Sequence, residues 1–228
     1  MATTTRAPRT SRRKAAEPAT DRPKADPTRA KLLDAATEVF AERGYYAATV
    51  REISQRAGTN IASVNYYFRD KLGLYTEVLR RAVSSVGLAA RAEFERDLPP
   101  EQALRAAVKV FLSRLYGRDR PSVPFRLMRH ELSQPTPAMS QVVNEVMRPN
   151  YDRLRAAVGS ILGLPPDHET TRLCAHSIMG QVLFYPMTAP VMPIIWPQLK
   201  VTPERLDDIA NHIVNFSLAY LRSARAKP

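Results

Sequence analysis

The sequence has little cysteine, tryptophan or glycine, and it has no long uninterrupted apolar run. Its single cysteine, Cys174, excludes an intramolecular disulfide and is typical of a protein from a reducing compartment. The apolar neighbours of Cys174 favour a buried, inert thiol over a redox sensor. The most apolar stretch, residues 182–196, is too short to span a bilayer and is interrupted by prolines, so we expect no membrane span.

Patterns for catalysis or metal binding are also scarce. His130, Glu131 and His176 lack a metal-ligand spacing such as H-x-x-x-H, and the chain has neither a glycine-rich phosphate loop nor a nucleophile elbow. We therefore expect a protein that is not an enzyme and that holds no cofactor or metal. The basic N-terminus is not followed by an apolar segment, so it lacks the pattern of a signal peptide, and a cytoplasmic location is expected.

Positive charge is what the chain has in excess. The formal net charge is +12, whereas the hydrophobic content of 44% is ordinary for a globular protein. This charge favours a polyanionic partner, either nucleic acid or an anionic membrane surface, although a basic tail that aids solubility gives the same total. In residues 1–27, Arg and Lys outnumber Asp and Glu and no apolar period is visible. We predict a disordered basic arm there, which either lies along DNA or is a solvated tail.

From residue 28 onward, apolar residues recur with a helical period and without strand alternation, so the predicted fold class is all-α. The first helix is expected to be capped by Thr28 and to end at Gly44. Pro149 predicts a break near Met147. Later helices are predicted at residues 71–97, 101–116, 125–133, 137–162, 167–185 and 203–223. Asp70 is the predicted N-cap of the first of these helices, and Asp167 is that of the helix that reaches residue 185. Residues 186–197 are predicted to be irregular.

Residues 49–71 carry the most informative pattern, two short helices joined by a glycine-containing turn. Thr49 and Glu52 form a T-x-x-E capping box for the first helix, Gly58 ends it, and Asn60 is suited to cap the second. Each helix has one apolar face, and the second has polar and aromatic residues on the other. The pattern is typical of a DNA-binding helix-turn-helix whose second helix enters the major groove; it also fits a helical hairpin in an α-helical core.

The wider stretch, residues 28–79, resembles the DNA-binding domain of the TetR family of bacterial transcriptional regulators. The runs AATEVFAERGYYAATVREISQRAG and SVNYYFRDKLGLY carry this resemblance. More loosely, FRLMRHELSQPTPAM, VMRPNYDRL and HSIMGQVLFY resemble the C-terminal domain of the CecR-type branch, which is associated with control of drug-efflux and tolerance genes. The resemblance implies an N-terminal three-helix DNA-binding domain at residues 28–74 and a larger α-helical effector-binding and dimerisation domain at residues 75–228.

The resemblance also implies which side chains touch DNA: Thr49, Arg51, Ser63, Asn65, Tyr66, Tyr67 and Lys71. Arg51 suits either a phosphate or a guanine edge, and Lys71 suits a phosphate. Tyr67 stands where the family often has a phosphate-contacting residue. Asn65 departs from the tyrosine that is commoner at this position, and an asparagine can bond an adenine edge with both of its amide atoms. For Tyr66, core packing is the alternative.

In this family, the last two long helices of each subunit form a four-helix bundle in the dimer. Two stripes of this sequence suit such an interface: Leu173, Ser177, Gly180, Phe184, Leu206, Ile209, Ile213, Ser217 and Tyr220. The same spacing fits a core within one chain. A two-fold pair of recognition helices would double the DNA site and so supports a homodimer.

A ligand pocket is predicted from aromatic, methionine and polar residues of the middle helices. Its candidate members are Phe111, Leu115, Phe125, Met128, His130, Asn150, Tyr151, His176, Gln181 and Tyr185. Apolar walls with a few polar groups are typical of ligand pockets and equally of ordinary cores.

These features together predict a ligand-responsive, homodimeric repressor of efflux or drug-tolerance genes. It would bind an inverted-repeat operator in double-stranded DNA and respond to a small, mainly apolar effector, with no membrane partner. One alternative is a TetR-like DNA-binding regulator without a small-molecule effector. The other is an all-α enzyme or carrier with a basic tail.

Overall fold

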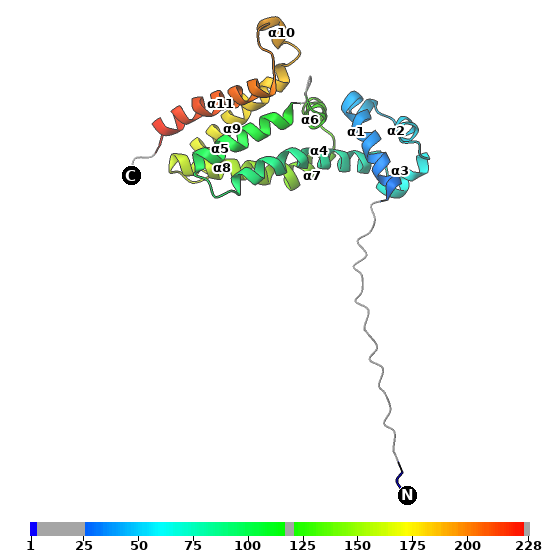
Figure 1. Ribbon diagram of the computed structural model, residues 1–228. Helices are drawn as coiled ribbons and strands as arrows, with labels where there is room; N and C mark the ends of the chain where they lie inside the picture. Colours follow the sequence, from blue (N-terminus) through cyan, green and yellow to red (C-terminus); the bar gives the residue numbers. More distant parts are fainter. Residues whose placement is uncertain (4–25, 117–120, 226–228) are drawn as a thin grey trace.

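The computed structural model of the protein describes residues 1–3, 26–116 and 121–225. Every regular secondary-structure element in these ranges is a helix. The predicted all-α fold class is therefore confirmed. Figure 1 shows a small head of α1, α2 and α3 at one end, from which α4 runs along a bundle of longer helices. The predicted basic arm, residues 1–27, lies almost wholly outside the described residues.

The helices follow one another in a simple order. Their bounds are α1 (Pro27–Ala47), α2 (Val50–Ala57), α3 (Ile61–Phe68), α4 (Lys71–Phe94), α5 (Pro100–Leu115), α6 (Val123–Ser133), α7 (Ala138–Val142), the π-helix η1 (Val143–Met147), α8 (Arg148–Leu162), α9 (Glu169–Thr188), α10 (Met192–Ile195) and α11 (Pro203–Ser223). Within the described part of the chain, no helix is both long and apolar enough to cross a membrane.

Three predicted caps of the head are confirmed. Thr49, Asn60 and Asp70 cap α2, α3 and α4, each with a side-chain oxygen that accepts from a backbone N–H at 2.7–3.1 Å. These bonds satisfy donors that the first turn of a helix leaves free, so they fix where each short helix begins. The spacing of the helix-turn-helix is therefore set locally, by residues that the sequence alone reveals.

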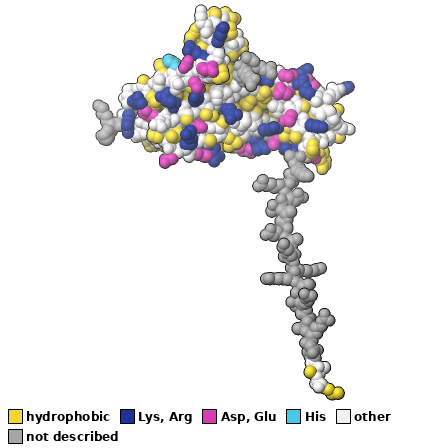
Figure 2. All heavy atoms as spheres, viewed as in Figure 1, with side chains coloured by type: hydrophobic (Ala, Val, Ile, Leu, Met, Phe, Trp, Pro, Cys, Tyr) yellow, Lys and Arg dark blue, Asp and Glu magenta, His cyan; other side chains and the backbone are white. Residues whose placement is uncertain are grey.

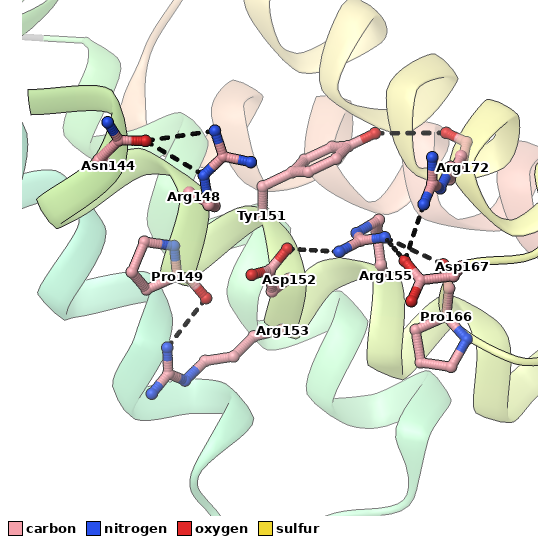
Figure 3. A network of polar contacts seen from close by, with 10 residues as sticks. All are labelled: Asn144, Arg148, Pro149, Tyr151, Asp152, Arg153, Arg155, Pro166, Asp167 and Arg172. Atoms are coloured by element: carbon pink, nitrogen blue, oxygen red, sulfur yellow. Dashed lines mark hydrogen bonds and ion pairs between the residues drawn. The ribbon is translucent and has the colours of Figure 1, made fainter. Parts of the chain in front are cut away.

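Two other predicted caps are wrong. Asp26, not Thr28, caps α1, because Pro27 occupies the first helical position and the Asp26 carboxylate accepts from the Thr28 N–H at 2.8 Å. His168, not Asp167, caps α9. The Asp167 carboxylate instead accepts hydrogen bonds from arginines of α8 and α9, as Figure 3 shows.

The prolines have different consequences along the bundle. The break predicted near Met147 takes the form of the π-helix η1, which ends two residues before Pro149. The irregular stretch predicted at residues 186–197 is wrong over much of its length. Helix α9 continues through the buried Pro186 to Thr188, and α10 forms beyond it. Burial of the proline ring in the core offsets the backbone hydrogen bond that proline cannot donate.

Two apolar clusters meet along α4. The head cluster contains Phe40, Ile53 and Val64 together with the first half of α4, and it also takes Leu127 from α6. The larger cluster fills the bundle between α5, α8, α9 and α11. Helix α4 therefore belongs to both clusters, which makes it a rigid connection between the head and the bundle.

Candidate DNA-binding surface and ligand cavity

The outer face of α3 is exposed to solvent. Val64 and Phe68 are buried in the head cluster, and Asn65 and Tyr66 between them point outward, while Tyr67 is half-buried against the same cluster. Asn65 is exposed and Tyr66 is 82% exposed, so Tyr66 does not pack in the core. Ser63 is half-buried at the edge of this face. Fixed caps on rigid helices hold these side chains in one arrangement, as a groove-reading helix requires.

Two more of the predicted contacts lie at the start of α2. Thr49 and Arg51 are both exposed. The Thr49 hydroxyl oxygen already accepts from the Glu52 N–H, while Arg51 has its side chain in solvent. The N-terminus of a helix attracts anions, which suits a phosphate contact at this point.

Two predicted DNA contacts already have partners within the chain. The Tyr67 hydroxyl donates to Asp26 at 2.5 Å, and this bond lowers the pKa of the Asp26 carboxyl and raises the pKa of Tyr67. The Lys71 Nζ lies 4.5 Å from the centre of the Tyr45 ring, and partial burial lowers the pKa of Lys71. Both side chains would have to change partners to reach a phosphate. The role of Asp26 was missed because the residue lies in the predicted arm.

A cavity of about 410 Å³ lies in the bundle beside the head. Its volume falls in the range of small-molecule sites, and almost all of its lining side chains are apolar. Six of the ten predicted pocket residues line it: Phe111, Leu115, Phe125, Met128, Asn150 and Tyr151. They come from α5, α6 and α8.

Part of the lining was missed at the sequence level. The second half of α4 contributes Val83, Val86, Gly87 and Ala90. The apolar period of α4 could have revealed them, because it continues past the residues that the head uses. Helix α4 thus gives its first half to the head and its second half to the cavity wall.

The predicted pocket residue His130 faces the head instead of the cavity. Its Nε2 lies 3.4 Å from the Ala41 carbonyl oxygen, and its ring covers Gly44 in α1. Gly44 has φ 73°, and a Cβ there would lie 2.9 Å from the His130 Nδ1. Both the backbone conformation and the close approach of the imidazole therefore require glycine at this position.

The other three predicted pocket residues also lie outside the lining. His176 is exposed on the outer side of α9. Gln181 donates to the Ser217 hydroxyl at 3.4 Å and so joins α9 to α11. Tyr185 packs against the edge of the bundle cluster. All three lie on α9, and the faces that carry them do not turn toward the cavity.

A buried polar cluster fastens α6 to α4. Glu131 has no exposed surface; its carboxylate accepts from the Tyr75 hydroxyl at 2.7 Å and from the Thr136 N–H and hydroxyl at 3.1 and 2.9 Å. Burial, and then this bond, raise the pKa of Tyr75. Because a buried carboxylate is costly without such partners, the cluster fixes α6 in one register against the head.

The predicted dimer stripe divides between two environments. On α9, Leu173, Ser177, Gly180 and Phe184 are exposed, whereas on α11 the predicted residues Leu206, Ile209, Ile213 and Ser217 are buried in the chain's own core. Those four are therefore corrected from interface to core, because α5 and α9 cover that side of α11. The open side of α11 carries Phe216, which is 65% exposed, and the predicted Tyr220.

A projection between α9 and α11 also exposes apolar side chains. It carries α10, and its exposed side chains include Val191, Ile194, Ile195 and Trp196. Figure 1 shows it standing away from the bundle, and Figure 2 shows apolar side chains gathered on it. The apolar side chains of the projection, like those on the open sides of α9 and α11, are left uncovered by the described part of this chain.

Family models match both parts of the chain. Residues 32–78 match the model of bacterial regulatory proteins of the tetR family, and residues 100–221 match the C-terminal domain of the HTH-type transcriptional dual regulator CecR. The second match alone covers more than half of the chain. Both agree with the two resemblances drawn from the sequence.

Two relatives illustrate how the similarity is distributed. The chain is 29% identical to the HTH-type transcriptional dual regulator CecR of Shigella flexneri over 173 residues, which are 71% of this chain and 77% of that protein. It is 42% identical to the HTH-type transcriptional activator FasR of Mycolicibacterium smegmatis over 86 residues. That match covers 38% of this chain and only 39% of FasR.

Solved structures share the whole fold at low sequence identity. The transcriptional regulator FadR from Bacillus subtilis, in complex with stearoyl-CoA, has a TM-score of 0.63 at 18% identity over 83% of this chain and 97% of its own. AibR, in complex with isovaleryl coenzyme A and operator DNA, has a TM-score of 0.64 at 19% identity over 84% of this chain and 97% of its own.

Proposed function

This chain belongs to the TetR family of bacterial transcriptional regulators, and we propose that it is a homodimeric repressor whose operator binding is relieved by a small, mainly apolar effector. Family membership makes it a DNA-binding regulator rather than an enzyme. The proposal adds the repressor role, the effector, the dimer, a cytoplasmic location, and efflux or drug-tolerance genes as targets. It also assigns DNA binding to residues 28–74 and effector binding with dimerisation to residues 75–228.

The observation that carries the proposal is a wall shared by the cavity and the head. Val83 of α4 and Met128 of α6 both line the cavity, and both pack against the head cluster. A ligand that fills the cavity therefore touches side chains that support the helix-turn-helix. Such a ligand releases DNA only to the extent that it binds the DNA-incompetent arrangement more tightly.

The outward face of α3 supports a division between reading and positioning. We assign base contacts to Asn65 and its neighbours Ser63 and Tyr66, and phosphate contacts to Arg51 and Lys71. Tyr67 would join the phosphate contacts after leaving Asp26. Among the structural relatives, AibR is bound to operator DNA, which supports this use of the fold.

The exposed sides of α9 and α11 support the homodimer. Leu173 and Phe184 on α9, with Phe216 and Tyr220 on α11, form an apolar surface that a monomer would leave in water. Gly180 lies between them, and a Cβ added to it would meet nothing within 4 Å, so a partner helix has room to approach closely. Two-fold pairing through this face would place two copies of α3 on one duplex.

Selection of bound duplexes from a random pool tests this function directly. We expect an inverted repeat whose half-site centres lie about one helical turn, or a multiple of it, apart. For about six neutralised phosphates, the slope of log affinity against log salt should be roughly −5. Equal affinity for selected and scrambled duplexes at physiological salt, or a slope near zero, would contradict the proposal.

A further inference from the structure

We propose that the guanidinium of Arg69 binds a phosphate of the operator at the end of α3, and that this contact is why the chain keeps a strained residue there. The inference rests on the proposed function, because it adds one contact to the DNA-binding surface assigned above.

Arg69 has an unusual backbone conformation. Its φ is 72° and its ψ is −46°, and in the described part of the chain every other residue with a positive φ is a glycine. These angles lie near those of a γ-turn with positive φ, which is rare and strained for a residue that carries a side chain. A glycine would take this conformation without a steric cost, so an arginine here is unfavourable for stability.

The neighbours of Arg69 impose this conformation. Phe68 is buried in the head cluster, and Asp70 caps α4 by accepting from the Gly73 N–H at 2.7 Å. A Cβ at Gly73 would collide with the Phe68 carbonyl oxygen, so α4 begins directly against the end of α3. Because only Arg69 and Asp70 separate the two helices, the change of direction falls on the backbone of Arg69.

The same geometry carries the Arg69 side chain outward. Its N–H still donates to the Asn65 carbonyl oxygen at 3.0 Å, so Arg69 lies one turn beyond Asn65, on the side of α3 that is proposed to face DNA. At this positive φ the main chain turns away, and Cβ takes the direction that a helical main chain would follow. The side chain therefore prolongs α3 into solvent, and Arg69 is exposed.

The charge of Arg69 is available to an anion. Other arginines of the head are engaged, since Arg43 pairs with Glu52 and Arg56 pairs with Glu42. Arg69 has no such partner among the residues that the structure describes. A guanidinium can donate two parallel hydrogen bonds to one phosphate, so Arg69 can fix the position of α3 on the duplex without reading a base.

The test is Arg69→Gly, which relieves the strain and removes the charge. We expect its melting temperature, followed by circular dichroism, to rise by about 2–4 °C. Its affinity for the operator duplex selected with the wild type should fall about 5-fold at physiological salt, and the slope of log affinity against log salt should become less steep by about 1. A scrambled duplex should lose affinity by a similar factor, because a phosphate contact carries no base preference.

Two further variants are the controls. Arg69→Lys keeps both the charge and the strain, so it should retain most of the affinity and the salt slope and show no rise in melting temperature. Arg114→Ala removes an exposed arginine of α5, in the bundle, and should leave affinity and slope unchanged.

An Arg69→Gly variant that binds both duplexes as tightly as the wild type would overturn the phosphate contact. An equal loss of affinity in Arg114→Ala would reduce the effect to net charge and overturn it as well. A melting temperature of Arg69→Gly at or below that of the wild type would overturn the strain, because Arg69 would then stabilise the C-terminal end of α3. If the wild type itself binds selected and scrambled duplexes equally, the proposed function fails, and this inference fails with it.

Discussion

Removing the Tyr75 hydroxyl should measurably destabilise the protein. The hydroxyl has no exposed surface and donates to the Glu131 carboxylate at 2.7 Å. Hydrogen bonds to charged groups contribute about 1.5–3 kcal/mol, and Thr136 keeps its own bonds to the carboxylate in the variant. We therefore expect Tyr75→Phe to lower the free energy of unfolding by about 1.5–3 kcal/mol.

Urea unfolding followed by circular dichroism measures this change, with an unchanged m-value as the sign that the folded and unfolded states keep their compactness. The matched control is Tyr46→Phe, because the Tyr46 hydroxyl is exposed and its hydrogen bond to the Pro135 carbonyl oxygen is long, at 3.4 Å. That variant should stay within about 0.5 kcal/mol of the wild type. A Tyr75→Phe variant as stable as the control would refute the idea that the Glu131 cluster fastens α6 to α4.

Three further predictions concern the DNA-binding surface and the core. Lys71→Ala should weaken binding to all duplexes by a similar factor, whereas Asn65→Ala should cost about 1–3 kcal/mol on the selected operator and relax one base position; selection repeated with each variant checks both. Asp26→Asn keeps a capping side chain but removes a negative charge beside Tyr67. Operator affinity, measured by fluorescence anisotropy at low salt, should therefore rise about threefold. An unchanged affinity would contradict a phosphate contact by Tyr67. Burial raises the pKa of the Cys174 thiol. A thiol reagent at mildly alkaline pH should therefore react at least about tenfold more slowly with the folded chain than with the urea-unfolded chain. Equal rates would place the thiol at the surface.

The head was the part most readily predicted from sequence. Its caps at Thr49, Asn60 and Asp70 are bonds between neighbours in the chain, so the residue pattern and the structure coincide. The wrong cap of α9 depends on distant partners. Asp167 is drawn away by Arg155 of α8 and by Arg172, and a helix start can shift by a residue or two when such a partner is present.

The cavity and the dimer face were harder, because a stripe of apolar residues does not tell which neighbour covers it. The apolar period of α11 is the same whether Ile213 packs against its own chain or against a partner chain. Only the packing of α5 and α9 against α11 shows that Ile213 is buried within its own chain. In α6 the two sides have different neighbours, so Met128 lines the cavity while His130 faces α1. Nearby residues of one helix therefore received the same prediction although they serve different surfaces.

The most direct test of the account is operator affinity measured by anisotropy with and without a cavity-binding compound found by calorimetric screening of apolar drugs and metabolites. At saturation, the compound should weaken operator binding roughly 5- to 150-fold, and the operator should weaken binding of the compound by the same factor. Phe111→Asp, which places a charge in the cavity wall, should retain operator binding and lose the response. A compound that binds tightly in the cavity of the wild type and leaves operator affinity unchanged would contradict the coupling between cavity and head.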